Sequence, residues 1–198
     1  MIAQASARPL FEFCPFLLSF LAPALTMNLI TEERRERRLG LLTSLPIDYS
    51  ALIIGKFFGA WLLFVTALCC TLCIPLSISW IGPLDWGPVV TGYIGMLLAG
   101  SAYLSIGLWM SCIASTGLTS WLLAVAICFT LYLIGKASFF LPIIWGEWAQ
   151  SLSVEMRLER FTRGVIDSRD VIYFLVISLI GLASATQALR RERAPSSL

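Results

Sequence analysis

Four long stretches of this sequence contain no charged side chain, and they cover residues 13–31, 57–84, 86–135 and 171–189. An α-helix rises about 1.5 Å per residue, so about 20 residues cross a hydrocarbon core roughly 30 Å thick. Each stretch is therefore long enough to span a membrane. The composition agrees, because 58% of the residues are hydrophobic and only 13% are charged. Such a balance excludes an ordinary soluble domain.

The stretch over residues 86–135 is long enough for two helices. Small and polar residues gather over 111–120, which includes Gly117, and they favour a turn there. A strand barrel is excluded, because the stretches lack alternation of apolar and polar residues. We therefore predict an all-α integral membrane protein that forms one transmembrane domain over residues 1–198. Its five spans are expected at about residues 14–31, 53–80, 88–112, 119–141 and 171–189.

Lysine and arginine are unevenly divided between the two sides of these spans. The side that holds segment 32–56 and the C-terminal tail carries eight of them, against five on the other side. The positive-inside rule then places segment 32–52 in the cytoplasm and the loop 143–170 outside. With five spans the N-terminus lies outside, although residues 1–12 make a poor signal peptide. We therefore expect a chain that is mis-started, truncated or degenerate at its N-terminus.

The residue types exclude several kinds of chemistry. The sequence has no histidine, which is the commonest general base and metal ligand, and no Gly-rich phosphate loop that ends in Gly-Lys-Ser or Gly-Lys-Thr. Lys136 is the ionised group well inside a predicted span, and we expect it to snorkel towards the outer interface. We therefore predict that the chain is not an enzyme and binds no cofactor. Carboxylates are scarce in the spans, which argues against an ion-coupled carrier.

The six cysteines all fall in or beside predicted spans. Cys69 and Cys73 stand one helical turn apart, and with Cys70 they could offer soft ligands to Cu(I). The interpretation that we prefer is packing between membrane helices, since cysteine is small and apolar. No metal site is predicted.

Segment 32–52 concentrates charge between the first two spans. Its first seven residues hold four arginines and three glutamates, and leucines follow before Pro46. Proline disfavours helix at the residue before it, and Asp48 can cap the helix that follows. The pattern predicts a short helix at the cytoplasmic surface, charged at its start and leucine-rich at its end. An ordinary positive-inside anchor with a lipid-facing leucine patch is the alternative.

The loop over residues 143–170 contains a second amphipathic pattern. Val154, Leu158, Phe161 and Val165 recur on one helical face, while charged residues that include Arg163 lie away from it. The helix is expected to end near Gly164, and Asp167 and Asp170 to cap the last span. We interpret this helix as an interfacial anchor; a lid over an exit path is the alternative.

The third predicted span has a surface of small residues, which are Gly92, Gly95, Gly100 and Gly107 with Ala99, Ser101 and Ser105. Small residues let membrane helices approach closely. Internal packing and a dimer contact are equally compatible with this surface.

Several segments together resemble the ABC-2 type transporter permeases. They are APALTMNLITEERR (22–35), LGLLTSLPI (39–47), GKF (55–57), DWGPVVTGYIG (85–95), AYLSIGL (102–108) and FTRGVIDSRDVIY (161–173). Within that family the sequence looks most like the permeases associated with gliding motility and with copper-enzyme maturation.

The resemblance implies a permease subunit of an ATP-driven exporter in a bacterial inner (plasma) membrane. Such a subunit has six spans, pairs with a second permease subunit, and works with two cytoplasmic ATPase subunits that bind the ATP and magnesium. It does not bind nucleic acid. A coupling helix after the second span would fall here on about residues 36–45. The resemblance implies ATPase contacts for Glu32, Glu33, Arg37, Arg38, Leu39, Leu41, Leu42, Leu45 and Pro46.

Two departures from the family pattern bear on this expectation. Arg37, Arg38 and Gly40 stand where the family has a different run that includes a carboxylate. With five predicted spans against the family's six, the resemblance also implies that the family's first span is missing. A non-transporting membrane scaffold or assembly factor with a degenerate permease fold is therefore the main alternative. The sequence indicates no substrate.

Overall fold

The computed structural model describes residues 8–35, 48–81, 85–137 and 153–192. Over these residues the chain forms helices and no strand, which confirms the all-α prediction. The helices are α1 (Arg8–Thr26), α2 (Asn28–Arg35), α4 (Tyr49–Thr71), α5 (Cys73–Ile81), α6 (Trp86–Ile113), α7 (Gly117–Ala137), α9 (Val154–Thr162) and α10 (Ser168–Glu192).

Five stretches of these helices are long and apolar enough to cross a membrane, as the sequence predicts. They are Phe13–Arg35, Tyr49–Trp80, Trp86–Ile113, Gly117–Lys136 and Ser168–Arg191. The first joins α1 to α2 across a break at Met27, and the second joins α4 to α5 across a break at Leu72. Pro75 explains the second break, because its ring nitrogen has no N–H for the carbonyl of Thr71.

The turn between α6 and α7 lies at residues 114–116, inside the segment where the sequence predicts it. Two threonines cap the start of α7, because the backbone N–H of Thr119 donates to the hydroxyl oxygen of Thr116 over 3.3 Å. The two helices therefore leave the turn as separate spans.

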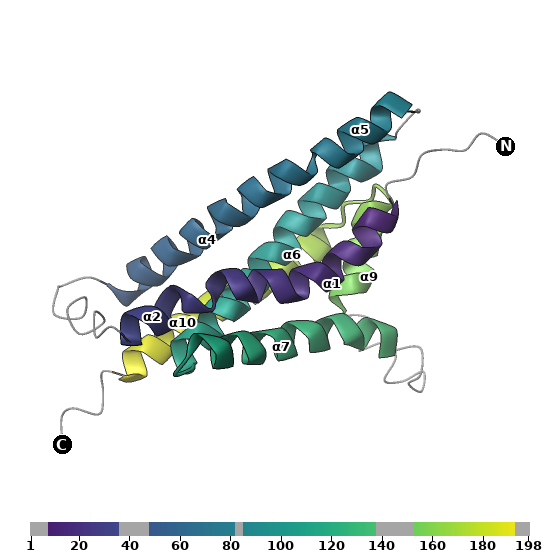
Figure 1. Cartoon of the computed structure of the whole chain (residues 1–198). Helices are drawn as coiled ribbons and strands as arrows, with labels where there is room; N and C mark the ends of the chain where they lie inside the picture. The colour runs from purple at the N-terminus through teal and green to yellow at the C-terminus, as the bar shows by residue number, and fades with distance from the viewer. Residues whose placement is uncertain (1–7, 36–47, 82–84, 138–152, 193–198) are drawn as a thin grey trace, which may run out of the picture.

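Helix α6 is the centre of the bundle. It runs through the middle in Figure 1 and packs against α1, α2, α4, α7, α9 and α10. In the most apolar 18-residue stretch of α6, 78% is buried inside the protein. The corresponding share is 22% in each of the spans formed by α4 with α5, by α7 and by α10. The other spans therefore surround α6 and turn apolar side chains outward, as helices in lipid do.

Glycines on α6 allow its neighbours to come close. A Cβ atom at Gly95 would lie 2.9 Å from Phe161 of α9, and one at Gly100 would lie 2.1 Å from the ring of Phe64 of α4. Gly107 meets α1 in the same way. These glycines therefore serve internal packing, the first of the two uses that the sequence leaves open.

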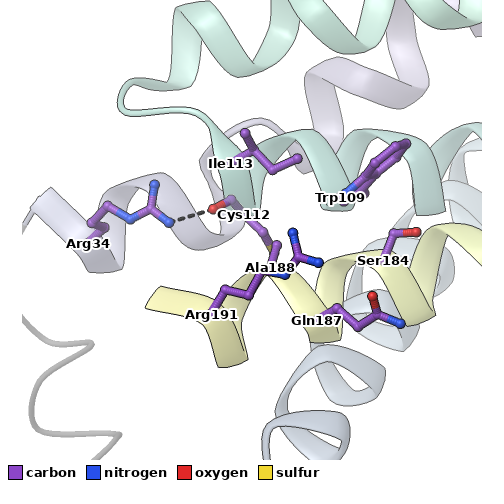
Figure 2. A pocket seen from close by; sticks show the side chains of 8 residues that line it. All are labelled: Arg34, Trp109, Cys112, Ile113, Ser184, Gln187, Ala188 and Arg191. Carbon is purple, nitrogen blue, oxygen red and sulfur yellow. Dashed lines mark hydrogen bonds between the residues drawn. The ribbon is translucent and has the colours of Figure 1, made fainter. Parts of the chain in front are cut away.

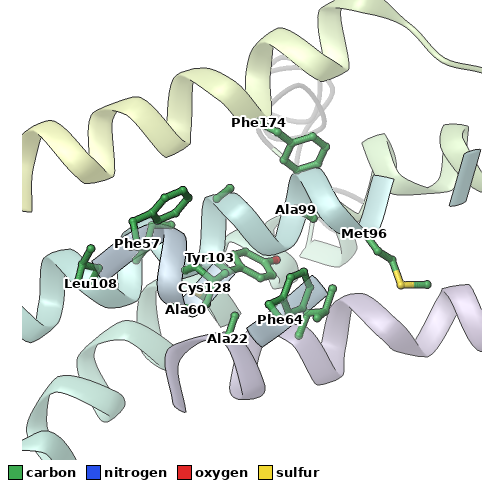
Figure 3. Packing of buried hydrophobic residues seen from close by; sticks show 14 of the residues in the cluster. Ala22, Phe57, Ala60, Phe64, Met96, Ala99, Tyr103, Leu108, Cys128 and Phe174 are labelled. Carbon is green, nitrogen blue, oxygen red and sulfur yellow. The ribbon is translucent and has the colours of Figure 1, made fainter. Parts of the chain in front are cut away.

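The core around α6 draws side chains from all five spans, and Phe174 belongs to α10. Tyr103 of α6, Phe64 of α4, Ala22 of α1 and Cys128 of α7 belong to one buried cluster, part of which Figure 3 shows. Because lipid offers no hydrophobic gain between helices, close van der Waals contact at such a cluster stabilises the bundle.

The six cysteines differ in burial, and Cys14 is half-buried. Cys112 and Cys128 are buried between helices, as the packing interpretation expects. Cys69, Cys70 and Cys73 are exposed, so they do not pack between helices of this chain, and the packing interpretation is wrong for them. They lie where α4 passes into α5, a region that makes few contacts with the rest of the bundle. Over the described ranges no three metal-ligating side chains gather at one place.

The contact at Gly107 gives a first prediction. A Cβ atom there would lie 2.1 Å from Thr26 Oγ1 and 3.2 Å from the backbone Cα of Pro23. Gly107→Ala should therefore destabilise the protein by about 1–3 kcal/mol, because α1 must move away from α6. Unfolding by sodium dodecyl sulfate in mixed micelles measures the change.

Gly59→Ala on α4 is the matched control, because a Cβ atom at Gly59 meets nothing within 4 Å. It should leave stability unchanged or raise it by up to about 1 kcal/mol through helix propensity. Equal destabilisation by the two substitutions would contradict the close packing of α1 on α6.

Candidate coupling site

Several helices begin or end at one end of the bundle. The ends of α2, α6 and α10 and the starts of α4 and α7 gather there (Figure 1). Arg35 and Asp48, which flank residues 36–47, both belong to these helix ends. We call this region the coupling site, because the expected ATPase contacts lie between these two residues or, as Glu32 and Glu33 do, just before Arg35 on α2.

Ser111 of α6 spans the break between α1 and α2. Its hydroxyl donates to the carbonyl of Met27 over 3.0 Å and accepts the N–H of Ile30 over 3.2 Å. Both contacts are buried or partly buried. Buried backbone groups cost free energy when they lack partners. The Ser111 side chain thus gives hydrogen-bond partners to two backbone groups at the helix break and fixes α2 to α6.

Arg34 of α2 binds the end of α6. Its two terminal nitrogens donate to the carbonyls of Cys112 and Ala114, over 2.5 and 2.6 Å. Figure 2 shows the bond to Cys112. The last carbonyls of a helix have no partner within the helix and carry partial negative charge, so a guanidinium is well suited to them. A second, independent contact therefore joins α2 to α6.

Lys56 joins α2 to the next span. Its ammonium group lies 2.6 Å from Glu33 Oε1 and donates to the carbonyl of Leu29 over 2.5 Å. The Lys56 side chain is only 16% exposed and that of Glu33 is 27% exposed. Since both charges are largely removed from water, each depends on the other. The first turns of α4 are thereby tied to α2.

Helix α7 also begins against α2. A Cβ atom at Gly117 would lie 2.1 Å from Asn28 Oδ1, so the start of α7 lies directly against the side chain of Asn28 on α2. Further along, the indole N–H of Trp121 donates to the carbonyl of Phe20 over 3.3 Å. Helix α2 therefore contacts α4, α6 and α7 at once, and the four helix ends form one unit.

The residues that the sequence assigns to ATPase coupling divide into two groups. Glu33 is paired with Lys56, and Glu32 is exposed on α2. Asp48 stands at the N-cap position of α4, but its side chain makes no capping hydrogen bond. The others lie outside the described residues, and they are Arg37, Arg38, Leu39, Leu41, Leu42, Leu45 and Pro46.

Sequence reasoning missed Lys56 and Ser111 as parts of this site and assigned no partner to Arg34. Lys56 did carry a signal, because it falls inside the predicted span 53–80 and a charge there needs a partner. Ser111 carried none, since a serine near a helix end is common.

The opposite end of the bundle is closed by α9. Its apolar residues Val154, Leu158 and Phe161 are buried, and Thr91 of α6 donates to the carbonyl of Phe161 over 2.6 Å. The expectation of an interfacial anchor is therefore wrong for this face, which packs against α6 and not against lipid.

The end of α9 differs from the sequence prediction in one residue. Val165 was placed on the apolar face, but it is 56% exposed, because α9 ends at Thr162 and the chain turns at Gly164 with φ +85°. This left-handed conformation favours glycine. Arg163 pairs with Glu159, and both side chains are largely exposed.

Asp170 has a role that the sequence prediction did not include. It is fully buried, and Arg157 and Arg160 each donate to its Oδ1 atom over 2.6 Å. Of the two aspartates that were predicted to cap α10, Asp167 does so, because its carboxylate accepts the N–H of Arg169 over 3.0 Å. Asp170 therefore ties α10 to α9 through buried charge.

A weaker ion pair joins α9 to α7. Lys136 lies 3.5 Å from Glu155, and its own side chain is 58% exposed. Burial raises the pKa of Glu155, and the nearby ammonium group opposes that rise. Since solvent screens this pair, it contributes little to stability.

Lys56 offers a test of the coupling site. Lys56→Met should destabilise the protein by roughly 2 kcal/mol, because the Glu33 carboxylate would stay largely buried without its partner. Lys136→Met is the matched control and should change stability by less than about 0.5 kcal/mol. Unfolding in mixed micelles measures both, and a similar loss for the two variants would contradict the assignment.

Asp170 offers a test at the other end. Asp170→Asn should cost about 3 kcal/mol, because it leaves the largely buried guanidinium of Arg157 without its counter-charge. Asp167→Asn should be nearly neutral, since asparagine caps helices as well as aspartate does. If both variants unfold at the wild-type detergent concentration, the buried ion pair is not what joins α9 to α10.

Comparison with known proteins agrees with this architecture. The sequence model of the family described as ABC-2 family transporter protein matches residues 3–143, which is more than two thirds of the chain. The match gives no support to the narrower subgroup of gliding-motility and copper-enzyme-maturation permeases. No curated protein matches the chain. The chain therefore belongs to the ABC-2 family of transporter proteins and is a multi-pass membrane permease component.

Proposed function

We propose that this chain is the permease subunit of an ATP-driven exporter and receives mechanical work from a separate cytoplasmic ABC ATPase through segment 32–52. The observation that carries the proposal is the attachment of both flanks of residues 36–47 to the bundle. Arg34 and Ser111 hold α2 to α6, and Lys56 holds α4 to α2. A force applied between these flanks reaches the most buried helix directly.

The proposed mechanism is a rigid-body movement. Closure of two ATPase subunits on ATP would displace residues 36–47, and α2 would carry the displacement into α6. Because α4 and α7 are joined to α2 as well, these spans would tilt together and not bend. At the other end, α9 links α6 to α10 through Asp170, so the tilt would reach the far side of the bundle.

The partners follow from this mechanism. The ATPase would bind ATP and magnesium, and a second permease subunit, identical or related, would complete the transporter in a bacterial inner membrane. Arg37 and Arg38 add positive charge to the expected contact surface. We infer that the receiving groove of the ATPase is acidic, because charge complementarity selects partners at such surfaces.

Copurification tests the proposal. An ATPase with a Walker motif should remain bound to the wild-type chain solubilised from its native membrane. The double substitution Leu41→Asp and Leu42→Asp should reduce the bound ATPase by at least about tenfold, since two charges would enter an apolar contact. The matched control replaces the same leucines with methionine and should retain the ATPase.

A third variant separates binding from transmission. Lys56 lies outside residues 36–47, so the Lys56→Met variant should keep the ATPase bound. It should lower the rate of ATP-driven transport by the complex in nanodiscs. Absence of any ATPase from the wild-type preparation would contradict the proposal and favour a non-transporting scaffold. Transport that persists without ATP would instead favour a secondary carrier.

A further inference from the structure

A cleft of about 580 Å³ opens between α6 and α10 beside the coupling site. Arg34, Arg191, Ser184, Gln187, Trp109 and Ile113 are among its lining residues (Figure 2). Neither the proposed ATPase contact nor the family assignment uses this cleft. Its size falls within the range of ligand sites in proteins, roughly 300–1,000 Å³.

The lining is positively charged. Among the described residues that line it are two arginines and no carboxylate. Arg34 already offsets the negative end of α6 through its bonds to the carbonyls of Cys112 and Ala114. Arg191 makes no ion pair with any residue that the structure describes. Ser184 and Gln187 add neutral hydrogen-bond donors. The cleft is therefore suited to an anion that accepts several hydrogen bonds.

One side of the same cleft is apolar. Trp109 and Ile113 come from the last two turns of α6, and Ile113 is 53% exposed. Ile113 and Arg191 are also the last residues of their membrane-spanning stretches, so the cleft lies at the level of a membrane surface. Tryptophan and arginine are typical of that level, where apolar and charged groups meet. A ligand with an anionic head and an apolar continuation fits both sides.

We propose that this cleft binds the phosphodiester headgroup of an anionic phospholipid from the leaflet on the α2 side of the membrane. The guanidinium of Arg191 would contact the phosphate, with Gln187 and Ser184 as further donors. The start of the acyl chains would lie along Trp109 and Ile113. Basic pockets between membrane helices bind anionic headgroups in this way.

The position of the cleft gives the bound lipid a structural consequence. Arg34 is shared between the cleft and the junction of α2 with α6, and Arg191 belongs to α10. A headgroup that contacts both arginines would join α10 to this junction. Bound lipid should therefore stabilise the end of the bundle from which coupling is proposed to start.

Native mass spectrometry of the purified, delipidated chain tests the proposal, with dioleoyl phosphatidylglycerol or dioleoyl phosphatidylcholine added at equal concentration. The wild type should retain phosphatidylglycerol in preference to phosphatidylcholine. Arg191→Gln should weaken retention of phosphatidylglycerol about fivefold, which corresponds to the loss of one arginine near a headgroup. Retention of phosphatidylcholine should not change.

Arg190→Gln is the matched control, because Arg190 is exposed on the neighbouring position of α10 and does not line the cleft. It should retain phosphatidylglycerol within about twofold of the wild type, since a charge outside the cleft acts only through screened attraction. Gln187→Leu keeps every charge and should also weaken retention of phosphatidylglycerol. Agreement between Gln187→Leu and Arg191→Gln would show that the loss does not come from misfolding of one variant.

Three outcomes would overturn the proposal. Equal losses in Arg190→Gln and Arg191→Gln would show general attraction of anionic lipid to the helix end. Equal retention of the two lipids by the wild type would show that the cleft does not select charge. Displacement of phosphatidylglycerol by millimolar inorganic phosphate, with phosphate retained in its place, would show a site for a small anion and not for a lipid.

Discussion

The hydrogen bonds of Ser111 and Arg34 join α2 to the end of α6, and the arrangement of this end of the bundle depends on that junction. The first span breaks at Met27, and a break in a membrane helix is tolerated only where neighbouring groups satisfy the backbone. Ser111 provides those groups, and Arg34 in turn satisfies the last carbonyls of α6. Each helix thus completes the other, so neither end can move alone without leaving buried polar groups unpaired.

The rest of the bundle is arranged so that movement at this junction is not lost. Small residues on α6 keep α1, α4 and α9 within close packing distance. Closely packed interiors transmit displacement because they resist compression. At the far end, the buried carboxylate of Asp170 holds α9 and α10 together. Buried ion pairs and main-chain contacts therefore hold both ends of the bundle, and van der Waals packing connects them through the middle, together with a hydrogen bond between Ser101 of α6 and Ser178 of α10.

The sequence predicted the spans well, because crossing a hydrocarbon core demands long uncharged runs, and no tertiary information is needed to find them. It also placed the turn near Gly117. It could not predict the break at Met27, whose partner Ser111 is far away in the sequence, nor the burial of Asp170, which depends on two arginines of another helix. Val165 was misplaced because helical periodicity was extended beyond the turn at Gly164. Local patterns identify helices, while the partners of buried polar groups require the fold.

The central claim is that α2 and the end of α6 move as one body. Spin labels at Arg35 on α2 and at Ser115 just after α6 report this distance directly, since both positions are exposed. The measurement uses the chain in nanodiscs with its six native cysteines replaced, together with its ATPase, without nucleotide and after trapping with ATP and vanadate. The account predicts one narrow distance distribution that is the same in both states. A distribution that shifts or splits when nucleotide is trapped would show that α2 moves independently of α6, and would contradict the account.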